Sequence, residues 1–134
     1  MSDLHHYDLT TSTWTQLPSS SAISGRGGAE FIALGRDKLL VLGGFSGKEN
    51  SDVHAYDIAA QTWQQLASTT EAACSLTPRS VFTAAHVAAE HAVIVYGGEV
   101  DPSDKGHAGQ YTYIPAIADH CRTLIRSTSV DMVS

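Results

Sequence analysis

The chain has 134 residues, of which 43% are hydrophobic, and a formal net charge of −6 with only eight Lys and Arg. The scarcity of basic residues argues against a nucleic-acid-binding surface, which needs a basic stripe. No run approaches the ~18 consecutive apolar residues of a membrane-spanning helix, and no basic stretch followed by an apolar one marks a signal peptide. Two cysteines are too few for a disulfide framework. These absences predict a soluble cytoplasmic protein that binds neither nucleic acid nor membranes.

Runs of apolar and β-branched residues, interrupted by short polar turns, predict strands along most of the chain. The turn Gly35–Lys38 separates two such runs and is typical of a hairpin. Asp57 opens another turn, where we expect its carboxylate to accept hydrogen bonds from backbone amides. Asp52 and His54 share one face of a strand, where a solvated or hydrogen-bonded pair is expected rather than metal ligands. In chain order, the predicted strands are residues 4–7, 31–34, 39–42, 52–57, 62–66, 81–87 and 91–96.

The predicted strands belong to a repeat with a period near fifty residues. Tyr7 recurs 49 residues later as Tyr56, and Gly43-Gly44 recurs 54 residues later as Gly97-Gly98. An apolar run that ends in Gly-Gly, with Tyr-Asp and Trp farther along, resembles the kelch repeat. In that family each repeat is one four-stranded blade of a β-propeller. The resemblance implies an all-β fold in which Trp63 packs between blades.

The repeats set the expected domain organisation. The chain holds roughly two incomplete kelch repeats, whereas about four to eight blades are needed to close a propeller. The first repeat starts within a blade, so we expect a fragment of a larger propeller. Residues 1–111 are assigned to the kelch repeats. A third Tyr-Asp and Trp does not follow, so residues 112–134 are predicted to be a tail foreign to the blades, either disordered or an aberrant reading frame.

One loop carries the residue types of a metal site. Residues 99–107 contain three carboxylates and a histidine. Carboxylate oxygens with one imidazole suit Fe(II) or Mn(II). Pro102 and Gly106 let the chain fold back, so that Glu99 and His107 face one ion. On composition alone, an acidic surface turn is the competing interpretation of this loop.

The same loop carries a finer resemblance, which extends over roughly residues 4–111. The chain looks like the kelch-type nitrile-specifier, epithiospecifier and thiocyanate-forming proteins, in which Gly-Gly-Glu is followed by Asp four residues on and His after four more. Glu99 and His107 match that pattern, whereas Ser103 stands at the middle position and Asp104 lies one residue beyond it. The resemblance therefore implies an Fe(II) site and catalytic centre formed by Glu99, Asp104 and His107.

The resemblance to specifier proteins also implies a reaction. These proteins act on the aglycone that myrosinase releases from glucosinolates, a thiohydroximate-O-sulfonate, and direct its breakdown towards nitriles, epithionitriles or thiocyanates. Arg26 and Arg79 are candidate sulfate binders, because guanidinium groups form paired hydrogen bonds with such anions. Phe45 is a candidate lining residue of the same site. The alternative role of the two arginines is to bridge blades by bonding backbone carbonyls.

Three interpretations of the whole chain follow. In the first, it is a fragment of an iron-dependent specifier-like protein, whose lyase-like activity on a small sulfated thiohydroximate belongs to the full-length parent. In the second, it is a kelch interaction module that binds a protein partner without catalysis. In the third, it is a truncated product with no independent function. The fold alone does not decide between them.

Overall fold

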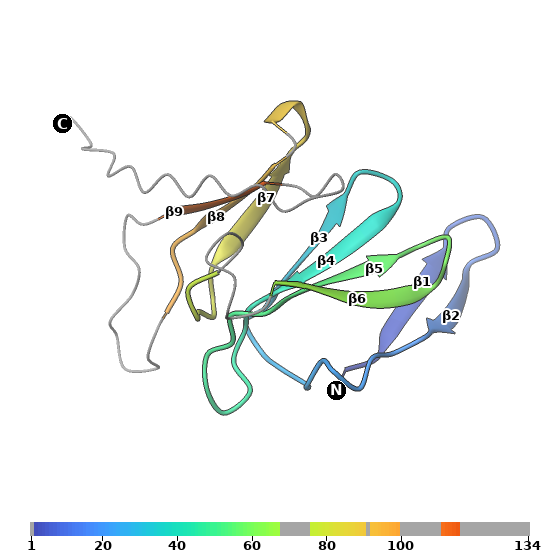
Figure 1. The fold of residues 1–134 in the computed structure, drawn as a ribbon. Coiled ribbons are helices and arrows are strands. Elements are labelled where there is room, and N and C mark those ends of the chain that lie inside the picture. Colours follow the sequence, from blue (N-terminus) through green and yellow to red (C-terminus); the bar gives the residue numbers. More distant parts are fainter. Residues whose placement is uncertain (1, 68–75, 91, 100–110, 116–134) are drawn as a thin grey trace.

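The computed structural model describes residues 2–67, 76–90, 92–99 and 111–115 (Figure 1). Within these ranges the chain is all-β, as predicted, and forms three antiparallel sheets that do not close into a propeller. No helix in this part of the chain is long and apolar enough to cross a membrane. The elements are β1 (Leu4–Asp8), β2 (Thr13–Leu17), β3 (Glu30–Leu34), β4 (Lys38–Leu42), β5 (Val53–Asp57), β6 (Thr62–Ala67), β7 (Thr83–Val87), the 3-10 helix η1 (Ala88–Glu90), β8 (Ala92–Tyr96) and β9 (Tyr111–Pro115).

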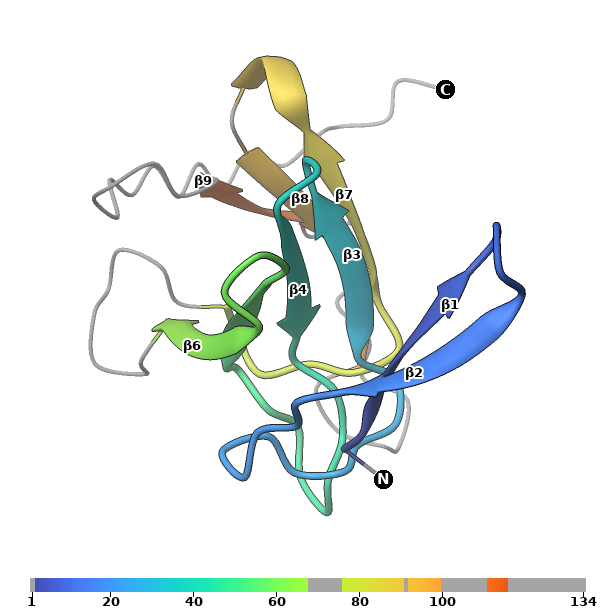
Figure 2. The same cartoon turned by 90° about the vertical axis from the view of Figure 1, so that its right-hand side faces the viewer.

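The central sheet is one complete four-stranded blade with the order β3-β4-β5-β6. It lies between the β1–β2 hairpin and the sheet β7-β8-β9 (Figure 1), and Figure 2 shows the hairpin nearest the viewer. The Asp57 carboxylate accepts a hydrogen bond of 2.8 Å from the amide of Ala60, which confirms the predicted turn. Asp8 caps the β1–β2 turn in the same way, with a bond of 3.1 Å from the amide of Thr11, the counterpart of Ala60. The two hairpins are therefore built alike.

Alternate side chains of the central sheet point to opposite faces, as the two-residue period of a strand requires. One face carries Leu40 and Leu42, which are buried against Val93 and Val95 of β8 and against Phe82. Burying a side chain of this size contributes about 1.5–3 kcal/mol. This interface is therefore the main hydrophobic core of the described residues.

The opposite face of the central sheet lies against the β1–β2 hairpin. The Trp63 indole nitrogen donates a hydrogen bond of 2.9 Å to the carbonyl of Pro18, in the segment that follows β2. Its ring packs on Tyr56 with the two centroids 5.1 Å apart. Trp63 thus joins neighbouring sheets, which confirms its predicted place between blades.

The third sheet extends beyond the sequence-based boundary between kelch repeats and tail. β9 pairs with β8 over its whole length, from Tyr96↔Tyr111 to Ala92↔Pro115. The boundary predicted after residue 111 therefore falls at the start of a strand that has the position of β5 in the central blade. Residues 116–134, which make up most of the predicted tail, lie outside the described residues.

Val81 has a backbone conformation that is unfavourable for its side chain. Its φ is +52°, in the left-handed region. The corresponding residue of the preceding repeat is Gly28, whose φ is +59°, because Arg26–Ala29 aligns with Arg79–Phe82. The amide of Val81 donates a hydrogen bond of 2.8 Å to the carbonyl of Gly28, which helps to hold the two loops together.

We predict that Val81→Gly raises the free energy of unfolding by about 1–2 kcal/mol, because glycine has no Cβ to strain in this region. The measurement is a urea denaturation curve. The matched control is Gly28→Ala, which should destabilise the protein, since its added Cβ would lie 2.8 Å from the Val81 nitrogen. A loss of stability in Val81→Gly would show that the Val81 side chain contributes more through packing than its backbone costs.

Candidate functional site

Loops from two sheets are joined by backbone hydrogen bonds at one end of the strands. The amides of Gly27 and Phe45 each donate to the carbonyl of the other, at 2.9 and 2.8 Å. Ser80 and Glu99 pair in the same way, at 3.0 and 2.7 Å, and Gly44 donates to the carbonyl of Arg79 at 2.8 Å. We call the surface formed by residues 24–29, 43–52, 77–82 and 97–99 the loop face. Its backbone is fixed by contacts between loops of the same sheet and by contacts between the central and third sheets.

Close backbone approach in the loop face depends on the glycine pairs that the repeat pattern revealed. Gly44 has a φ of +94°, and a Cβ at this position would lie 2.7 Å from the Cβ of Ala29. Gly98 is its counterpart in the next repeat, with a φ of +99° and only 2.7 Å between an added Cβ and the Cβ of Phe82. The Gly-Gly signature therefore marks the places where two loops touch.

Arg26 forms a paired salt bridge with Asp52. Its two terminal nitrogens lie 2.5 and 3.0 Å from the two carboxylate oxygens of Asp52. One of them also donates to the carbonyl of Gly43, at 2.9 Å. The buried His54 ring lies 2.8 Å from Asp52 through Nε2, which confirms the predicted hydrogen-bonded pair. The salt bridge to Asp52 therefore holds the segment before β3, which contains Arg26, against the β4–β5 connection.

The environment of Asp52 favours its charged form. Burial raises the pKa of this carboxyl, but the hydrogen bonds from His54 and Arg26, together with the positive charge of Arg26, outweigh burial. The pKa of Asp52 consequently lies well below its usual value of 3.8. Asp52 stays ionised at all but strongly acidic pH.

Arg79 repeats part of the arrangement around Arg26. Its side chain is only 1% exposed, and one terminal nitrogen donates to the carbonyl of Gly97 at 3.0 Å. Gly97 is the counterpart of Gly43, so both arginines bond the first glycine of a Gly-Gly pair. Burial lowers the pKa of Arg79 below its usual value, yet arginine stays charged in proteins. These contacts fit the alternative role of the two arginines, which is to bond backbone carbonyls. Sulfate binding by either arginine stays a prediction.

The predicted iron site lies only partly within the described residues. Glu99 pairs with Ser80 through its backbone, at the edge of the loop face. Asp104 and His107 lie outside the described ranges. Within those ranges, no group of three or more His, Cys, Asp and Glu residues could hold a metal ion. The described residues therefore do not test the proposed ligand set, and iron binding stays a prediction.

Two apolar side chains are presented to solvent on the loop face. Phe45, which the sequence predicted to line a site, is 38% exposed, and Val81 is 65% exposed. Beside them, the Ser80 hydroxyl donates a hydrogen bond of 3.4 Å to the Glu49 carboxylate. Sequence reasoning missed Val81 and Glu49 as surface residues of this face. The alignment of Val81 with Gly28 was the available signal for the first.

We predict that Asp52→Asn lowers the free energy of unfolding by about 1–3 kcal/mol, the range for losing hydrogen bonds to a charged group. The stabilisation by Asp52 is fully present above the pKa of the unfolded state, because the folded-state pKa is lower, and it is lost as pH falls through the folded-state value. The difference in the free energy of unfolding between the two proteins should therefore begin to shrink as pH falls below about 4, where an unfolded aspartate becomes protonated, and should keep shrinking towards the lower folded-state pKa.

Asp57→Asn is the matched control for this experiment. An asparagine at the turn still offers an oxygen to the amide of Ala60, so the change in stability should be small. A stability difference between wild type and Asp52→Asn that is the same at pH 3 and pH 7 would contradict the role assigned to the Asp52 charge.

Comparison with known protein families supports the kelch resemblance. The family model of the KLHDC2/KLHL20/DRC7 Kelch-repeats domain matches residues 1–105. A search of curated proteins found no match. The family match is to the kelch type and gives no support to the finer resemblance to specifier proteins. The strand pattern, the Gly-Gly contacts between loops and the matched residues agree: the chain belongs to the kelch-repeat family.

Proposed function

We propose that this chain is a protein-interaction module that binds its partner through the loop face. Kelch domains generally mediate protein interactions. The observation that carries the proposal is the exposure of Phe45 and Val81 on loops whose backbone is fixed by hydrogen bonds to neighbouring loops. A surface that is ordered before binding loses less conformational entropy when a partner docks. Exposed apolar side chains on such a surface are suitable anchors.

The charged groups of the loop face favour a protein partner over a small sulfated substrate. The guanidinium group of Arg26 is engaged by Asp52 and Gly43, and its side chain is buried. Arg79 is buried as well and bonds the carbonyl of Gly97. The two groups proposed for the sulfate would have to leave these bonds to reach an anion. Phe45 needs no such rearrangement to contact a partner.

The test is a selection of peptides from a random phage-displayed library against the whole chain. The affinity of selected peptides is then measured by calorimetry for wild type and Phe45→Ala. We expect Phe45→Ala to weaken binding at least tenfold, as is typical of an apolar anchor worth about 2 kcal/mol. The control is Ile58→Ala, an exposed residue of the β5–β6 turn at the other end of the same strands, which should bind like wild type.

Two results would contradict the proposed function. One is a library that yields no specific peptide under conditions where the chain is folded. The other is a selected peptide whose affinity falls in Ile58→Ala and is unchanged in Phe45→Ala, because that would place binding at the opposite end of the blades.

Iron-dependent specifier activity in a full-length parent is a second proposal, which rests on the Glu99 to His107 loop of the sequence. A metal that binds only the folded protein raises its stability. Fe(II) under anaerobic conditions should therefore shift the urea midpoint of wild type upward. The shift should vanish in Glu99→Gln and His107→Ala and remain in Asp101→Asn. Equal midpoints with and without Fe(II) in wild type would remove this proposal.

A further inference from the structure

Val81 combines an unfavourable backbone conformation with a side chain that is mostly exposed. Its φ of +52° lies in a region that β-branched residues rarely adopt. The side chain is 65% exposed, and it belongs neither to the hydrophobic core nor to the apolar residues that pack against the core. Within the part of the chain that the structure describes, little packing therefore offsets the strain at Val81.

The neighbours of Val81 fix its conformation. The amide of Arg79 donates a hydrogen bond of 3.2 Å to the carbonyl of Asn50, and Ser80 is paired with Glu99. On the other side, Phe82 is buried in the core. A residue between such anchored neighbours must take the φ that the loop requires.

A glycine would meet this requirement without strain, as Gly28 does at the corresponding position of the preceding repeat. The loop geometry therefore accounts for the positive φ at position 81, but it does not account for a valine there. Strained residues that their surroundings hold in place occur preferentially at functional sites such as ligand clamps.

Val81 lies near the second exposed apolar residue of the loop face. Its amide donates to the carbonyl of Gly28 at 2.8 Å, while Phe45 exchanges two backbone hydrogen bonds with Gly27. Both apolar residues are thus held against one two-residue segment that has no side chains. A Cβ added to Gly28 would lie only 3.0 Å from a methyl carbon of Val81. Glycine at position 28 therefore leaves room beside this methyl group.

We propose that Val81 is a binding residue of the loop face, and that Val81 and Phe45 together hold one apolar side chain of an extended peptide segment of the partner. This inference rests on the function proposed above for the loop face. It adds the chemical class of the side chain that the partner inserts. It also assigns a role to a valine that costs the folded chain stability.

The groups around Val81 favour an apolar side chain over a charged one. A valine and a phenylalanine provide the contact surface, and removing such surfaces from water is favourable. Arg26 and Arg79, which could attract an anion, are bonded to the carbonyls of Gly43 and Gly97, and their side chains are buried. Because the loops are already fixed, the contact requires little ordering of the backbone.

The test uses the tightest peptide selected from the random library against the wild-type chain. Calorimetry gives its affinity for wild type, Val81→Gly and Val81→Ala. We expect both variants to bind on the order of tenfold more weakly, as for the loss of a valine contact surface. Val81→Gly should be at least as stable as wild type in urea, so its weaker binding cannot come from unfolding. Val81→Ala keeps a Cβ and its restriction of the backbone, so it separates lost contact from a loosened loop.

A second set of measurements locates the contact on the peptide. Each apolar residue of the peptide is replaced in turn by alanine, and every variant is titrated into wild type and into Val81→Gly. For one position, the loss of affinity should be several-fold smaller with Val81→Gly, because the partner of that side chain is already gone. Such a double-mutant cycle measures the coupling between the two side chains.

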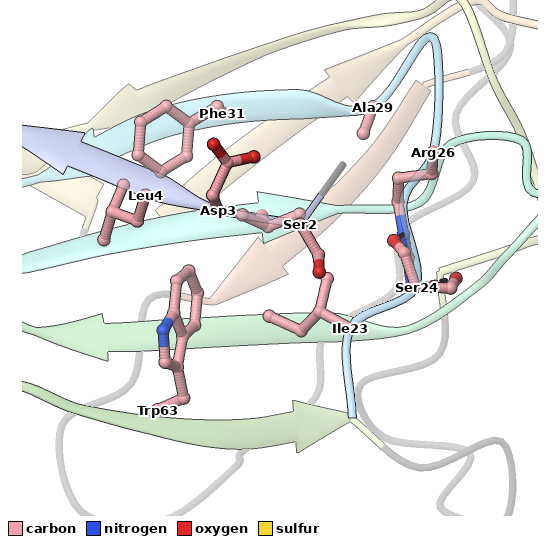
Figure 3. A pocket seen from close by; sticks show the side chains of 10 residues that line it. Ser2, Asp3, Leu4, Ile23, Ser24, Arg26, Ala29, Phe31 and Trp63 are labelled. Carbon is pink, nitrogen blue, oxygen red and sulfur yellow. Dashed lines mark hydrogen bonds between the residues drawn. The ribbon is translucent and has the colours of Figure 1, made fainter. Parts of the chain in front are cut away.

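The control addresses two cavities between the β1–β2 hairpin and the central sheet, where an apolar peptide could also bind. Their volumes are about 200 and 450 Å³, and Leu4 and Phe31 line both. In Figure 3 the side chains of Leu4, Phe31 and Trp63 surround the smaller one. Val81 lines neither cavity. Phe31→Ala should therefore leave the affinity of the peptide unchanged.

The outcomes separate this inference from the proposed function. A peptide that is weakened by Phe45→Ala, but binds Val81→Gly and Val81→Ala like wild type, would overturn the role of Val81 and leave the proposed function standing. Weaker binding to Val81→Gly with unchanged binding to Val81→Ala would also overturn it, because the valine would then act only by restricting the loop. An affinity that falls in Phe31→Ala alone would place the peptide in the cavities. A library without any binding peptide would contradict the proposed function and this inference together.

Discussion

The fold depends on the packing of each sheet against its neighbours through alternate side chains. β4 supplies Leu40 and Leu42 to one interface and Leu39 and Val41 to the other, so a single five-residue strand contributes to both. Because a strand in the middle of a blade has two apolar faces, every blade needs a cover on each side. Apolar side chains fill the interface with β8, whereas cavities remain in the interface beside β1.

The arginines show how one residue type can support opposite functional interpretations. A guanidinium group suits a sulfate as well as it suits a carboxylate or a carbonyl. In the structure Arg26 has Asp52 and Gly43, and Arg79 has Gly97, so both charges hold loops in place. The result is a loop face whose fixed backbone presents apolar groups to solvent. Its buried charges form the bonds that hold this backbone in place.

Local patterns in the sequence predicted more of the fold than of the site. Seven of the nine described strands, the Asp57 turn and the place of Trp63 follow from alternation, turn chemistry and the repeat, and the structure has them within a few residues. β2 (Thr13–Leu17) has no apolar run and was not predicted. β9 was missed because Ile114-Pro115 stands where the previous repeat has Tyr56-Asp57. The partner of Arg26 could not be foreseen, because Asp52 lies 26 residues away and only the folded sheet brings them together. The strain at Val81 becomes visible only once its φ is known.

The unequal filling of the two interfaces has a consequence for the order in which the molecule opens. The hairpin β1–β2 is held by the Trp63–Pro18 hydrogen bond and by side chains such as Leu4 that border cavities, whereas β4 and β8 share a closely packed core. Segments with few buried apolar contacts open at lower free energy than the core. Amide hydrogens of the hairpin should therefore exchange with solvent through local openings. Those of β4 should exchange only when the sheets that share the core unfold. The β1–β2 hairpin then opens at a lower free energy than the two sheets that share the core.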